Sequence, residues 1–148
     1  MSHGINNLPL IAGATMSGIA ALLHLGIIVG GAPWYRFFGA GERMAHAAQA
    51  GRWYPSIVTL CIAAVLAIAA CYALSGAGLM PRLPGLQIVL VVITAVYLLR
   101  GLVGLGLLWM QQRTYSKAFI VWSSLVCLAM GGLHLWGMAL VWPLLAHL

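Results

Sequence analysis

The stretch that decides the fold is 86–110, LQIVLVVITAVYLLRGLVGLGLLWM, in which Arg100 is the only charged residue. A helix needs about 20 mainly apolar residues to cross the hydrocarbon core of a bilayer. Segments 8–30, 55–75 and 118–145 are apolar over similar lengths and take up most of the remaining chain. The sequence therefore predicts four transmembrane helices.

The composition excludes an ordinary water-soluble globule. Of the 148 residues, 64% are hydrophobic and only 5% are charged, whereas soluble domains carry about 25% charged residues. The predicted spans leave no room for a soluble domain, so residues 1–148 are expected to form a single transmembrane domain. The net charge of +6 is scattered over short loops without a basic stripe. It therefore indicates membrane topology and gives no support for nucleic acid as a partner.

The short loops predict an orientation. Basic residues concentrate in the loops that stay in the cytoplasm. The first and third loops carry five of them and the second loop carries one, Arg82. Both termini are therefore expected outside the cytoplasm, and the first segment, which no basic region precedes, is expected to remain as a membrane helix. Tryptophans flank the two cationic loops, as in an interfacial aromatic belt: Trp34, Trp53, Trp109 and Trp122. The five basic residues are Arg36, Arg43, Arg52, Arg113 and Lys117.

The first loop contains a helix-compatible run over 41–50. Met44 and Ala47 can face lipid while Arg43 and Gln49 face water, which is typical of a helix lying in the membrane interface. The expected fold class is therefore an all-α membrane protein, a bundle of four transmembrane helices with a short interfacial helix in the first loop.

Glycines predict where helices approach closely. Gly26 and Gly30 form a GxxxG motif, and Gly101 and Gly104 lie on the third span. Small residues are the usual packing device between helices in lipid, so we expect these four to pack the bundle. Homodimerisation through Gly26 and Gly30 is an alternative.

Polar residues within the spans follow helical spacing, so each helix can turn one polar face into the bundle. The chain has no aspartate, and its only acidic residue is Glu42, one turn before His46 in the predicted interfacial helix. Depth along the helices brings this pair to the same side as His24 and Arg100. We therefore predict a cytoplasmic-side pocket for an amphipathic ligand, a lipid or a quinone, lined by Arg100, Glu42, His24, His46, Tyr97 and Trp34.

In that pocket Arg100 is neutralised either by Glu42 or by a bound anion. The alternative is structural. Arg100 then reaches up to lipid phosphates, and Glu42 pairs with Arg43, with Arg36 or with nothing. The span histidines would then bond to backbone carbonyls or serines.

Other functions receive less support from the sequence. An oligomeric proton or small-solute channel could use His24, Arg100 and His134 as polar steps, with Ser123 beside them. A b-haem between His24 and His134 is disfavoured, because their predicted depths differ by roughly 10 Å. No catalytic or metal-binding motif is found, and one carboxylate cannot supply an acid–base pair. The sequence therefore leaves catalysis open, leans against it, and assigns no catalytic residue and no metal.

Two short motifs carry a resemblance to a known family. The first loop reads YRFFGAGERMAHA (35–47) and the third span contains VYLLRGL (96–102). Together with four short helices they resemble the small bacterial four-helix membrane proteins of the DoxX-like type. The resemblance implies the same fold and a bacterial inner-membrane location. Members of this group differ in role: some are subunits of quinone-linked oxidoreductases, and many have no assigned activity. A role as an accessory subunit of a membrane complex therefore stands beside ligand binding as an alternative.

Overall fold

A computed structural model describes residues 7–108 and 117–146, with side chains as far as residue 143. Within these ranges the chain forms five helices and no strand. Four of them, α1, α3, α4 and α5, are long and apolar enough to cross a membrane. The protein is therefore an all-α, multi-pass membrane bundle, as the sequence predicts. The helices are α1 (Leu8–Phe37), α2 (Glu42–Gln49), α3 (Tyr54–Gly76), α4 (Leu86–Leu107) and α5 (Lys117–Ala146).

Most predicted boundaries agree with these helices to within a few residues, but the first does not. The sequence ends the first span at residue 30, whereas α1 continues to Phe37 across a break at Gly31, whose φ is 63°. Glycine adopts positive φ without steric cost, so the helix can restart in a new direction, with Pro33 in its first turn. Trp109, Arg113 and the end of the predicted 86–110 span lie outside the described residues.

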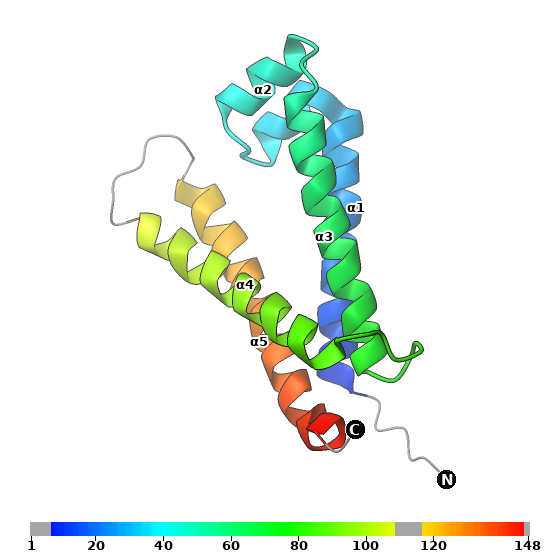
Figure 1. Ribbon diagram of the computed structural model, residues 1–148. Coiled ribbons are helices and arrows are strands. Elements are labelled where there is room, and N and C mark those ends of the chain that lie inside the picture. Colours follow the sequence, from blue (N-terminus) through cyan, green and yellow to red (C-terminus); the bar gives the residue numbers. More distant parts are fainter. Residues whose placement is uncertain (1–6, 109–116, 147–148) are drawn as a thin grey trace.

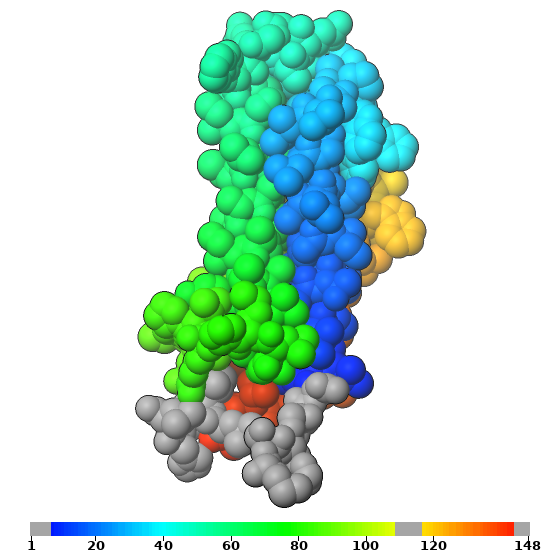
Figure 2. All heavy atoms as spheres, turned by 90° about the vertical axis from the view of Figure 1, so that its right-hand side faces the viewer, coloured from blue at the N-terminus to red at the C-terminus, as the bar shows by residue number. Residues whose placement is uncertain are grey.

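The long helices form two antiparallel pairs, α1 with α3 and α4 with α5 (Figure 1). The pairs cross near the end where α1 begins and α5 stops, and they diverge toward the end that carries α2 (Figure 1). Seen from the side, α1 and α3 run along each other for their whole length, with α2 and its loops at their far end (Figure 2). The outer faces of all four long helices carry exposed apolar side chains such as Val29, Leu60, Ile88 and Trp136, which suits contact with lipid.

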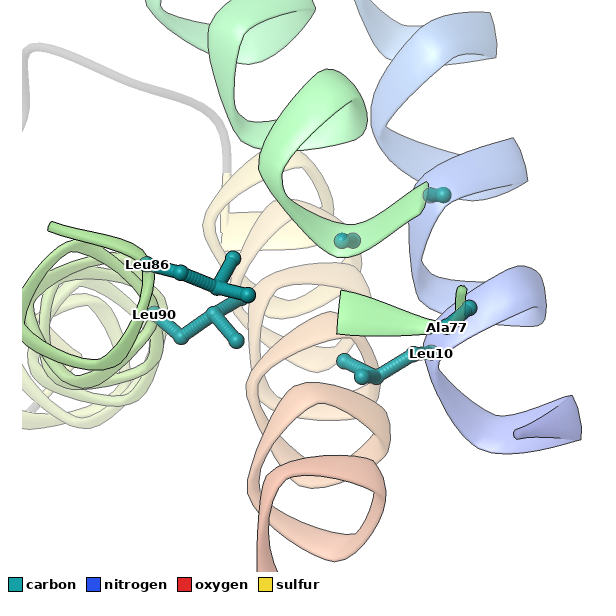
Figure 3. Close-up of a cluster of buried hydrophobic side chains, with 6 residues drawn as sticks. Leu10, Ala77, Leu86 and Leu90 are labelled. Carbon is teal, nitrogen blue, oxygen red and sulfur yellow. The ribbon is translucent and has the colours of Figure 1, made fainter. Parts of the chain in front are cut away.

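Where the pairs cross, small and branched apolar side chains from three helices meet (Figure 3). This cluster consists of Leu10 and Ala14 of α1, Ala73 with Ala77 next to α3, and Leu86 and Leu90 of α4. Helix α5 joins it through a hydrogen bond from Asn7 Nδ2 to the carbonyl oxygen of Gly137, 2.6 Å long.

Asn7 has a second role at the same place, since its Oδ1 accepts a hydrogen bond from the Leu10 amide at the start of α1 (3.1 Å). A capping asparagine is a strong helix-start signal, and here the same side chain also joins α1 to α5. At the opposite end, the ring of Phe119 on α5 packs against Gly39 in the turn after α1. A side chain of α5 therefore reaches the turn after α1, although the helix pairs diverge toward this end.

Candidate functional site

The most unusual group in the spans is the guanidinium of Arg100 on α4. Its Nη2 donates a hydrogen bond to Ser123 Oγ on α5 over 3.4 Å. Its Nη1 lies beside Gly104, 2.7 Å from the position that a Cβ on that glycine would occupy. Gly104 is one turn nearer the α2 end of the bundle, so the side chain extends along α4 in that direction. Arg100 is exposed on the outside of the protein.

A second polar group lies against the same glycine. Ser124 Oγ is fully buried, has no hydrogen-bond partner among the described residues, and occupies the space that a Cβ on Gly104 would need. A buried hydroxyl without a partner costs free energy that a bound acceptor or water can recover. The close α4–α5 approach at Gly101 and Gly104 therefore brings Arg100, Ser123 and Ser124 to one place.

Ser124 is a residue that the sequence analysis missed. The predicted polar face of the fourth span contains Ser123 and His134. Adjacent residues of a helix point about 100° apart, so Ser123 and Ser124 cannot both lie on that face. The signal that could have found Ser124 is the pair of glycines on the third span, which require a tightly packed partner on a neighbouring helix. Asn7 was missed as well, although asparagine before a proline-containing first turn is a recognised helix start.

The predicted contact between Glu42 and Arg100 is wrong. Glu42 Oε2 pairs instead with Arg36 Nε at 3.1 Å and with His46 Nε2 at 3.4 Å. Positive φ at Gly39 and Gly41 turns the chain tightly after α1 and returns Glu42 to Arg36. The carboxylate stays on the outside, with its side chain 67% exposed. Glu42 and His46 are thus brought together with Arg36, not with Arg100.

Tyr97 lies deeper, in a polar cluster at the centre of the bundle. Its hydroxyl shares a hydrogen bond of 2.9 Å with Ser17 Oγ on α1, and its ring lies 5.3 Å from the imidazole of His134. His134 is fully buried and packs against Gly13. Its Nδ1 donates to the Met130 carbonyl (2.8 Å), while Nε2 has no partner among the described residues. His134 thus fills the contact between the helix pairs rather than lining an open path through one chain.

His24 belongs to neither group. It is half-buried, and its Nδ1 bonds to the carbonyl oxygen of Ala20 in its own helix (2.7 Å). His134 contacts α1 at Gly13, eleven residues before His24, which is roughly 16 Å along a helix. The two imidazoles therefore cannot ligate one haem iron. The described residues also contain no cluster of three His, Cys, Asp or Glu side chains that could hold a metal ion.

Trp34 and two of the predicted packing glycines form another local unit. The break at Gly31 folds Trp34 back over Gly26 and Gly30, and its ring lies 5.7 Å from that of Phe38. This corrects the expectation that Gly26 and Gly30 pack against another helix of the bundle, because a side chain of the same segment covers them. Trp34 thus lies against α1 and Phe38, and among the described residues it is not brought together with Arg100.

The six residues of the predicted ligand site are therefore distributed over five places. Glu42 and His46 lie on α2, Trp34 covers α1, His24 bonds within α1, Tyr97 is central, and Arg100 meets Ser123 and Ser124 between α4 and α5. Only the last group combines a charge with a buried hydroxyl that has no partner. Comparison of the chain with protein-family models, with curated proteins and with solved structures finds no match.

Proposed function

We propose that this protein binds the polar head of an amphipathic ligand, a lipid or a quinone, at Arg100, Ser123 and Ser124. The observation that carries the proposal is the convergence of two groups on Gly104: a guanidinium without a carboxylate partner among the described residues and a buried hydroxyl without a partner. Phosphate, carboxylate or quinone carbonyl oxygens could accept hydrogen bonds from both. The quinone is included because of the resemblance to DoxX-like proteins.

The membrane strengthens this argument. A charged side chain within a span costs several kcal/mol unless it finds a partner or reaches the interface. Arg100 lies seven residues before the end of α4, about 10 Å along the helix, and its side chain recovers part of that distance. A ligand with its head at this depth and its tail along the exposed apolar faces of α4 and α5 would neutralise the charge, and it would satisfy the buried Ser124 hydroxyl where α4 and α5 separate slightly at Gly104.

Arg100→Leu tests the proposal. We expect the purified variant to lose a lipid or quinone that co-purifies with the unmodified protein, measured by mass spectrometry of an organic extract. Arg82→Leu, at the opposite end of the bundle, is the matched control and should keep the ligand. Arg100→Lys should bind weakly, because an ammonium cannot make the paired hydrogen bonds of a guanidinium. An unchanged extract from Arg100→Leu would contradict the proposal and favour an arginine that only reaches lipid phosphates.

The same variant also tests whether the partner of Arg100 is a bound ligand or Glu42. Because Glu42 pairs with Arg36 and His46, adding Glu42→Gln to Arg100→Leu should restore neither the bound ligand nor the thermal stability of the variant.

We further propose that the protein resides in a bacterial inner membrane with α2 on the cytoplasmic side and both termini outside. The α2 end carries Arg36, Arg43, Arg52 and Lys117, against Arg82 at the other end, and basic loops stay in the cytoplasm. In a cysteine-free background, an impermeant maleimide should label Arg82→Cys in intact cells and Arg43→Cys only after lysis. The reverse pattern would invert the orientation.

A further inference from the structure

A basic concavity lies between α2 and the start of α3, and Arg100 is not among the residues that line it. It has a volume of about 620 Å³ and is lined by Arg43, His46, Ala47, Ala50, Arg52 and Tyr54. Two arginines, an imidazole and a phenol thus face one space, and the described residues place no carboxylate in its lining. This arrangement presents hydrogen-bond donors and positive charge to whatever occupies it.

The two arginines keep their charge uncompensated. Glu42, the chain's only acidic residue, is engaged by Arg36 and His46. Arg36 also donates to Gln49 Oε1 (3.3 Å). Arg43 and Arg52 have no ion pair or side-chain hydrogen bond among the described residues. A planar guanidinium matches the geometry of a phosphate and binds it through two parallel hydrogen bonds.

The surroundings of the concavity are those of a membrane interface. Phe37 and Trp53, on either side of α2 in the chain, are 83% and 81% exposed, and large exposed aromatic residues are enriched at the level of lipid headgroups. Helix α2 lies beside the N-terminal end of α3, where the apolar span begins at Tyr54. We therefore expect the basic concavity at the depth of the bilayer phosphates.

A second concavity adjoins the first through a shared residue. Arg52 also lines a space of about 350 Å³ between α1, α2 and α3, together with Ile28, Ile57 and Trp53. A ligand whose phosphate sits between Arg43 and Arg52 can place apolar parts in this second space. Free phosphate would leave that space unused, whereas a phospholipid has the required combination of a charged head and an apolar body.

We propose that Arg43, Arg52 and Tyr54 form a binding site for the phosphate of an anionic phospholipid of the cytoplasmic leaflet. The site is separate from the ligand site at Arg100. Basic segments at the cytoplasmic ends of membrane helices attract anionic lipids, and here two arginines and a hydroxyl concentrate that attraction in one concavity. Lipid bound there would fix α2 to the membrane surface.

The test uses the full chain, delipidated in detergent and titrated with phosphatidylglycerol, with bound lipid counted by native mass spectrometry. Arg43→Gln with Arg52→Gln should weaken binding at this site about tenfold or more, as expected for the loss of charge-assisted hydrogen bonds. Arg82→Gln, which removes one positive charge at the other end of the bundle, is the control for loss of an arginine elsewhere and should bind as the unmodified protein does. All three residues are exposed, so circular dichroism should show unchanged helix content in each variant.

Two further measurements decide the nature of the ligand. Phosphatidylcholine should bind more weakly than phosphatidylglycerol, and inorganic phosphate at the same concentration should not displace the lipid. Displacement by phosphate would overturn the assignment to a lipid, and equal lipid binding by the double variant and the control would overturn the site. Arg100→Leu should retain this binding, so failure of the Arg100 proposal and failure of this one give different results.

Discussion

Gly137→Ala is expected to weaken the contact between α1 and α5 more than any surface change of one methyl group. A Cβ at this position would lie 2.5 Å from Leu10 Cγ and 2.8 Å from both the Leu10 amide nitrogen and Asn7 Oδ1. The amide belongs to the backbone, so α1 itself must move, and the hydrogen bond from Asn7 to the Gly137 carbonyl is then strained or lost. We expect a loss of about 1–3 kcal/mol, measured as a lower midpoint of thermal unfolding in detergent.

Gly132→Ala on the same helix is the matched control. A Cβ there would meet no atom within 4 Å among the described residues, and alanine is the better helix former by about 1 kcal/mol. The control should therefore unfold at the same temperature as the unmodified protein or slightly higher. If both variants lost stability equally, close packing at Gly137 would not be what holds α1 to α5.

The transmembrane helices could be predicted because lipid leaves the backbone few choices. With no water to satisfy amides and carbonyls, an apolar segment of sufficient length must form a helix. The residues after Gly30 show the limit of this argument. The chain leaves helical geometry at one residue, Gly31, and resumes it at once, so the aromatic residues up to Phe37 extend α1 although their composition is that of a loop.

The site could be predicted only in part, for a different reason. The sequence identified Arg100 and Ser123 as unusual, since polar groups inside spans need partners. It could not decide which partner Glu42 takes, because that depends on the tight turn at Gly39 and Gly41. That turn brings Arg36 within 3.1 Å of the carboxylate. The contacts made by residues in short loops depend on backbone φ and ψ angles, which cannot be predicted from amino-acid composition.

The contacts of Tyr97 and His134 also could not be predicted from the sequence. Both side chains were expected to face into the bundle. Which residues of α1 they contact depends on how the two helix pairs cross. Their crossing brings His134 to Gly13 and Tyr97 to Ser17, so one histidine lies in the contact between the two pairs. The absence of a side chain at Gly13 is what allows the imidazole to lie there.

This contact leads to a second large effect. A Cβ on Gly13 would lie 2.8 Å from both Nδ1 and Cε1 of His134. The fully buried ring has Tyr97 as another neighbour and little room to retreat. Gly13→Ala should therefore cost about 1–3 kcal/mol. His134→Ala should also destabilise the bundle, by about 2–5 kcal/mol, because it removes a buried ring and leaves a cavity.

The double variant Gly13→Ala/His134→Ala distinguishes a packing role of His134 from a role in proton transfer. If His134 acts mainly by filling space against Gly13, the Gly13→Ala change becomes neutral or stabilising in the His134→Ala background, since the added methyl enters the cavity. The coupling free energy between the two sites should then be about 1–3 kcal/mol, measured by thermal or denaturant unfolding of all four proteins. Additive losses would contradict the packing role. A proton-carrying imidazole, by contrast, would give a flux across proteoliposomes that His134→Ala abolishes and that Gly13→Ala cannot restore. Because the ring is enclosed between Gly13 and Tyr97 at no measurable exposure, we expect strong coupling in stability.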